Sequence, residues 1–160
     1  MGKAEILGRA ATYKDLCEVP DHQVAELIGR DLWVGPRPIL RHSYCAGMLA
    51  GQLVAPFGNG GEGPGGWWIL PECEIHMHGD VLVPDLAGWR RASLPSDPSG
   101  AYMSQPPDWA CEITSPSTGK LDRVLKAGIY APEGVRHLWL VDPPKRALQV
   151  EPTVLDLTKV

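Results

Sequence analysis

Residues 83–89 read Val-Pro-Asp-Leu-Ala-Gly-Trp and residues 107–114 read Pro-Asp-Trp-Ala-Cys-Glu-Ile-Thr, and these two stretches decide the fold. Both are apolar enough to predict buried strands, yet Asp85 lies in the first and Glu112 in the second. A buried carboxylate is costly unless a cation, a metal or a strong donor lies beside it. Two such groups on neighbouring strands predict a site for a hard divalent metal. Metal-assisted phosphodiester hydrolysis is therefore the first hypothesis for function.

The length and composition of the chain limit the function classes. With 160 residues we expect one domain, residues 1–160, with a core of its own. No run of 18 or more apolar residues occurs and no secretory signal is visible, so we expect no membrane span and a cytoplasmic protein. The net charge of −4 argues mildly against a nucleic-acid binder, although Lys120, Arg123 and Lys126 would form a local basic rim.

The order of predicted elements indicates an α/β or α+β fold with a mixed sheet and helices packed against it. A short helix begins after Thr12 as N-cap, and the six tryptophans are expected mainly in the core. The expected elements before residue 118 are a hairpin over 24–34 turning at 29–31, an amphipathic helix over 41–54, a hairpin over 72–85 and a strand over 109–113. A helix is then expected between Thr118 and Pro132, followed by a strand over 137–142 and a partner strand at 148–150. The buried face of that helix is expected to carry Leu121, Val124, Leu125, Gly128 and Ile129.

A rival metal site lies in the second hairpin. Residues 72–78 alternate, which places Glu74, His76 and His78 on one face of a strand, and His-x-His with a carboxylate can bind zinc or iron. The same alternation is more typical of the solvated face of an antiparallel hairpin. We therefore expect His76 and His78 to be exposed and free of metal. The four cysteines include no Cys-x-x-Cys pair, which favours small buried side chains over a zinc knuckle.

The residues around the two carboxylates match a longer pattern. Pro84-Asp85 and Glu112-Ile-Thr114 resemble the PD-(D/E)XK nuclease superfamily, in which Pro-Asp ends one strand and Glu-x-Lys lies on the next. Thr114 stands where that lysine is expected. From about Tyr13 to Val150 the chain resembles the Uma-two family of candidate restriction endonucleases. The matching residues are Glu26 to Leu32, His42, Val83 to Asp85, Glu112 to Thr118, Asp122, Lys126, Tyr130, Gly134-Val135 and Leu138 to Pro143.

The resemblance implies a restriction-endonuclease-like mixed central sheet flanked by helices. It implies that Asp85 and Glu112 hold Mg²⁺ or Mn²⁺ and that Lys126, from the following helix, replaces the missing strand lysine, with Lys120 as the next candidate. DNA is the implied substrate, and a homodimer is expected only by analogy with small nucleases that cut both strands. Further candidate members of the site are Glu26, Thr114, Asp122 and Tyr130.

Each candidate residue also has a structural interpretation. Asp85 could end its strand by accepting turn amides, and Lys126 could form a surface pair with Asp122 at i, i+4. Tyr130 is expected to be half-buried, and Asp108 is expected to cap the start of its strand. The rival function is a catalytically inactive relative that kept the fold and acts as a nucleic-acid or protein binding module. Thr114 and the acidic net charge favour that alternative.

Overall fold

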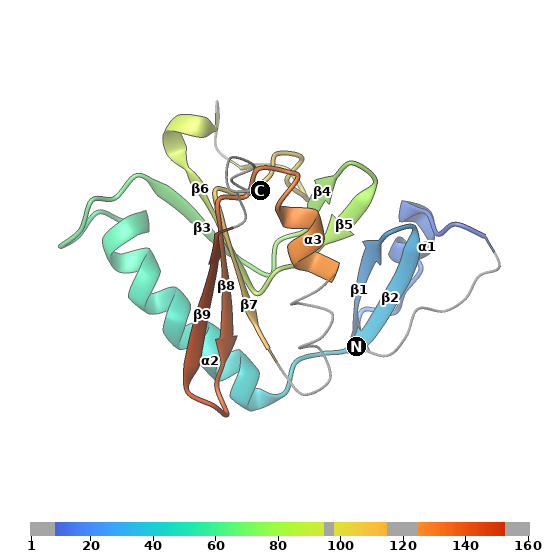
Figure 1. Ribbon diagram of the computed structural model, residues 1–160, viewed down its shortest axis with the longest axis horizontal. Helices are drawn as coiled ribbons and strands as arrows, with labels where there is room; N and C mark the ends of the chain where they lie inside the picture. Colours follow the sequence, from blue (N-terminus) through green and yellow to red (C-terminus); the bar gives the residue numbers. More distant parts are fainter. Residues whose placement is uncertain (1–8, 95–97, 115–124, 153–160) are drawn as a thin grey trace, which may run out of the picture.

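The computed structural model describes residues 9–94, 98–114 and 125–152, whose strands form two sheets (Figure 1). The smaller sheet has the order β2-β1-β5-β4, with β1 Gln23–Ile28, β2 Asp31–Pro36, β4 Ile75–Met77 and β5 Asp80–Leu82. The larger sheet has the order β3-β6-β7-β8-β9, with β3 Trp67–Pro71, β6 Leu86–Arg90, β7 Trp109–Ile113, β8 His137–Asp142 and β9 Ala147–Pro152. Because β7 and β8 are parallel and the other neighbours antiparallel, the mixed sheet of the predicted fold class is confirmed.

Helical segments lie on both faces of the larger sheet (Figure 1). Leu49 and Leu53 of α2 pack against Leu86 and Cys111 on one face, whereas Tyr130 of α3 packs with Leu138 on the other. No helix in the described residues is long and apolar enough to cross a membrane. The helical segments are α1 Tyr13–Cys17, α2 Leu40–Leu53, a π-helical turn Val54–Gly58, a 3-10 turn Arg91–Ser93 and α3 Ala127–Tyr130.

Local sequence accounts for the first hairpin and the helix before it. Gly29 and Arg30 both have positive φ, +61° and 73°, as a two-residue hairpin turn requires, so the predicted turn is confirmed. The backbone N–H of Thr12 donates to Asp15 Oδ2 at 2.7 Å, which caps the start of α1 as predicted. Leu27 and Leu32 then face each other across the hairpin and are buried with Val81.

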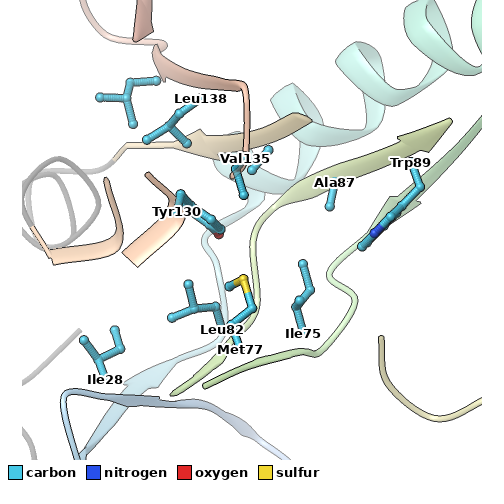
Figure 2. Close-up of a cluster of buried hydrophobic side chains, with 11 residues drawn as sticks. Ile28, Ile75, Met77, Leu82, Ala87, Trp89, Tyr130, Val135 and Leu138 are labelled. Atoms are coloured by element: carbon cyan, nitrogen blue, oxygen red, sulfur yellow. The ribbon is translucent and has the colours of Figure 1, made fainter. Parts of the chain in front are cut away.

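A core cluster joins the two sheets and α3. Figure 2 shows Ile28, Met77 and Leu82 of the smaller sheet gathered with Ala87 of β6 and Tyr130. Strand alternation divides the larger sheet between two clusters, so Trp67 packs on the α2 face and its neighbour Trp68 on the α3 face, as expected for adjacent strand residues. This core positions the end of β7 between α3 and the smaller sheet.

The two predicted amphipathic helices differ from expectation in which residues they bury. In α2 the apolar residues Tyr44 and Met48 are exposed, because only one side of that helix touches the sheet. Residues 115–124, the first part of the helix expected after Thr118, lie outside the described residues. At its described end Leu125 is 38% exposed, while Lys126 and Tyr130 are buried. The helix therefore points Lys126 and Tyr130 toward the interior, because the buried carboxylate of Glu112 lies there.

Candidate active site

Glu112 is the centre of the site, and its side chain is 2% exposed in the middle of the protein. On β7 it follows Ala110 on the α3 side by strand alternation. Lys126 Nζ donates to Glu112 Oε2 at 3.1 Å, and Tyr130 OH donates to Oε1 at 2.9 Å. Both oxygens of this buried carboxylate are therefore bound by donors one turn apart, Lys126 at the N-cap of α3 and Tyr130 as its last residue.

Lys126 also binds a second buried carboxylate. Its Nζ lies 2.9 Å from Glu26 Oε1, and that oxygen accepts the N–H of Val83 at 2.7 Å. The contact with Glu112 is the one expected for a lysine that replaces the strand lysine, and at 4% exposure Lys126 is not the surface lysine that a pair with Asp122 would require. Glu26 comes from the smaller sheet and Glu112 from the larger one, so the ammonium joins the two sheets. When all three groups are ionised, they carry a net charge of −1.

Asp85 lies where β6 begins, beside the end of β7. It directly precedes β6 and does not belong to β5, which ends at Leu82, so its expected place at the end of the hairpin strand is corrected. Leu86 pairs with Cys111 in an antiparallel register, so continuing this register by one residue brings Asp85 opposite Glu112. Its Oδ2 accepts the Ile113 N–H at 2.6 Å. The two carboxylates therefore come from neighbouring positions of adjacent strands.

His42 completes the surroundings of Asp85. It lies on the inner side of α2, and its Nε2 is 3.2 Å from Asp85 Oδ1 and 3.0 Å from the carbonyl oxygen of Ile113. The sequence pattern included His42 only as a family element and did not place it in the site. A histidine on the apolar face of an amphipathic helix was the available signal.

Thr114 and Asp108 have structural partners. Thr114 Oγ1 donates to the Val141 carbonyl of β8 at 3.1 Å, so this side chain binds the parallel neighbour strand. Asp108 accepts the N–H of Arg90 at 2.9 Å and holds the end of β6 beside the start of β7. Lys120 and Asp122, the two other predicted members of the site, lie outside the described residues. Among the described residues, Lys126 provides the positive charge that contacts Glu112.

The face of Glu74, His76 and His78 has another arrangement. His76 Nε2 lies 2.6 Å from Glu74 Oε1, which also accepts the Tyr13 hydroxyl at 2.8 Å and thereby raises the Tyr13 pKa. The His76 ring stacks on Tyr102 with centroids 3.9 Å apart, so the expectation of an exposed His76 is wrong. His78 is 87% exposed as expected and turns to Glu133. Tyr13 of α1 and Tyr102 both contact the His76 ring, and strand alternation cannot predict such contacts from distant segments.

Two of the cysteines have thiols that burial makes unreactive. Burial raises the pKa of Cys73 to about 12 and raises that of Cys111 as well. Both cysteines pack with apolar clusters as small side chains, Cys111 in β7 as expected, whereas Cys73 precedes β4 and is not in the expected strand.

The donor set at Asp85 and Glu112 suits one kind of ion. In the part of the chain that the structure describes, no group of three or more His, Cys, Asp or Glu side chains could hold a metal ion. Structural zinc needs four nitrogen or sulfur-rich ligands, whereas magnesium takes one or two carboxylates and keeps several waters. Asp85 lines a cavity of about 410 Å³ with Val24, Ala25 and Arg37, whereas the buried Glu112 is not among its lining residues. By their donor chemistry the two carboxylates suit magnesium or manganese and do not suit structural zinc.

The fold and the site together define a class of protein. A mixed sheet with Asp85 before one strand, Glu112 on the next and a lysine from the crossover helix is the arrangement of a restriction-endonuclease-like fold. The chain belongs to the Uma2 family, described as "Putative restriction endonuclease", whose sequence profile matches residues 10–153.

A solved structure has a similar fold. It is a protein from Anabaena variabilis ATCC 29413 described as a "putative nuclease belonging to DUF820", with a TM-score of 0.76 and 18% identity. The similarity covers 91% of this chain and 82% of that one, and at this identity it shows the fold alone. Comparison with curated proteins found no match.

Proposed function

We propose that this protein is a metal-dependent endonuclease that hydrolyses DNA phosphodiester bonds. The observation that carries the proposal is the position of the Lys126 ammonium, 3.1 Å from Glu112 Oε2, on a helix and not on the strand. Thr114, at the usual lysine position, is bound to the neighbouring strand. A lysine supplied from the N-cap of α3 would restore the composition of a PD-(D/E)XK site.

Asp85 and Glu112 would hold the divalent ion, Mg²⁺ or Mn²⁺. Such an ion lowers the pKa of a bound water and stabilises negative charge on phosphoryl oxygens. Asp85 is suited to this because its side chain is 15% exposed and lines the cavity. Glu112 is suited because Tyr130 and Lys126 hold its two oxygens in a set direction.

Lys126 would act on the phosphate and on the attacking water. An ammonium beside the metal ligands can orient a water molecule or stabilise the charge that develops in the transition state. Glu26 would be a positioning residue, since its Oε1 holds the ammonium at 2.9 Å and is itself held by the Val83 N–H. The phenol of Tyr130 would keep Glu112 from rotating away.

The rival function is a nucleic-acid or protein binding module without catalysis. The observation that favours it is the burial of Lys126 between two carboxylates, because an ammonium in ion pairs must move or share its contacts to reach substrate. The net charge of −4 also favours it. As a nuclease the protein would work in the cytoplasm, and a homodimer would allow both strands of a duplex to be cut.

A plasmid-nicking assay tests the proposal. Supercoiled DNA is incubated with the protein and Mg²⁺ or Mn²⁺, and a parallel sample contains EDTA. We expect metal-dependent nicking that Asp85→Asn and Glu112→Gln each reduce at least about 100-fold, as for loss of a group that acts in the transition state. Glu18→Gln is the matched control, because that glutamate is exposed on α1's end. Absence of nicking with both ions, on varied DNA, would favour the binding module.

A further inference from the structure

The imidazole of His42 lies between two oxygen atoms at the end of β7. Its Nε2 is 3.2 Å from Asp85 Oδ1 and 3.0 Å from the Ile113 carbonyl oxygen. A carboxylate oxygen and a carbonyl oxygen are both acceptors, so a hydrogen bond to either requires a proton on Nε2. The ring therefore donates from Nε2, whatever its overall charge.

This proton excludes two other roles for His42. A ring nitrogen that carries a proton cannot ligate a metal or accept a proton from water, so Nε2 is neither a ligand nor a general base in this arrangement. The other nitrogen, Nδ1, is buried, which keeps it from a cation in the cavity. What Nε2 can do is hold its two acceptors in place.

The contacts form a closed set around one residue, Ile113. Ile113 N–H donates to Asp85 Oδ2 at 2.6 Å, and His42 Nε2 donates to the Ile113 carbonyl at 3.0 Å and lies 3.2 Å from Asp85 Oδ1. Asp85 is thus held at both oxygens, once by β7 and once by α2. Ile113 directly follows Glu112, so the same contacts fix the strand that carries the second carboxylate.

We propose that His42 is a positioning residue through which α2 orients Asp85 and the end of β7 for binding a divalent cation. The inference rests on the proposed metal site at Asp85 and Glu112. Groups that orient metal ligands from outside the coordination shell typically change metal affinity by about 10- to 100-fold when they are lost. His42 has the position of such a group.

Metal binding of four variants tests the inference without any substrate. Mn²⁺ affinity is measured from the EPR signal of the free ion for the wild type, His42→Phe, His42→Gln and His42→Asn. The amide of glutamine reaches the place of Nε2, whereas that of asparagine reaches only the place of Nδ1. We expect His42→Phe and His42→Asn to weaken Mn²⁺ binding by about 10- to 100-fold and His42→Gln to restore most of it. His137→Gln is the control, because His137 is exposed on β8.

A second measurement follows the contacts that Asp85 and His42 make with Ile113. The Ile113 amide proton, in a 2.6 Å bond to a carboxylate, should resonate downfield in a ¹⁵N-correlated spectrum and exchange slowly. His42→Phe should move it upfield and speed its exchange, and His42→Gln should not. Because the glutamine and asparagine variants differ by one methylene, their comparison holds even if the phenylalanine variant folds poorly.

The outcomes separate this inference from the proposed function. Wild-type protein that binds no Mn²⁺ would refute the metal site and the inference together. Wild-type binding with equal affinity in His42→Phe, or equal affinities in the glutamine and asparagine variants, would overturn the role of His42 alone. An unchanged Ile113 amide in His42→Phe would also overturn it.

Discussion

Replacing Lys126 with methionine should destabilise the protein strongly. The change keeps most of the apolar stem and removes the ammonium, so Glu26 Oε1 and Glu112 Oε2, which Nζ contacts at 2.9 and 3.1 Å, lose their shared cation. Both carboxylates are at most 2% exposed, so solvent cannot replace it. Removing one partner of a buried pair typically costs about 3–5 kcal/mol, and with two carboxylates left behind we expect the upper half of that range.

Urea denaturation followed by tryptophan fluorescence gives the free energy of unfolding. The matched control is Lys145→Met, because Lys145 contacts Asp142 at 2.7 Å but is 70% exposed, and such surface pairs contribute about 0–1 kcal/mol. Adding Glu26→Gln and Glu112→Gln to Lys126→Met should recover more than half of the loss, since the uncompensated charges are then gone. If Lys126→Met is no less stable than Lys145→Met, the ammonium is not buried between these carboxylates in solution.

Two further predictions concern hydrogen bonds to carboxylates. Tyr130→Phe removes the 2.9 Å hydrogen bond to Glu112 Oε1 with little change in shape, so the free energy of unfolding in urea should fall by about 1–3 kcal/mol; an unchanged value would contradict that bond. The Arg9 guanidinium and Thr12 hold the pKa of Asp15 well below its usual range. A lowered folded-state pKa means that the stabilisation is present above the unfolded-state pKa and is lost as pH falls through the folded one. Thermal unfolding should therefore show Asp15→Asn less stable than wild type at pH 7, with the difference shrinking in acid, and a difference independent of pH would refute the assignment.

Local chemistry was enough to predict much of the fold. Gly29 marks the first hairpin, Thr12 with Asp15 caps α1, and the apolar runs around Glu112 and Leu140 mark the two parallel strands β7 and β8. These features depend on residues within a few positions of each other, so periodicity and turn chemistry reveal them. The two carboxylates stood out for the same reason, since each interrupts an otherwise apolar stretch of sequence.

The partners of those carboxylates depended on the tertiary structure. Glu26 lies in the first hairpin, 86 positions before Glu112, yet the two share one ammonium because Lys126 lies between β1 of one sheet and β7 of the other. The sequence indicated that Lys126 could reach Glu112, but not that Glu26 would share its ammonium, and His42 gave no sign of reaching Asp85. Sequence alone therefore determined which residues are unusual for their strands. Only the packing of distant elements decided which charges meet, because a buried charge takes its partner from whatever segment the core brings against it.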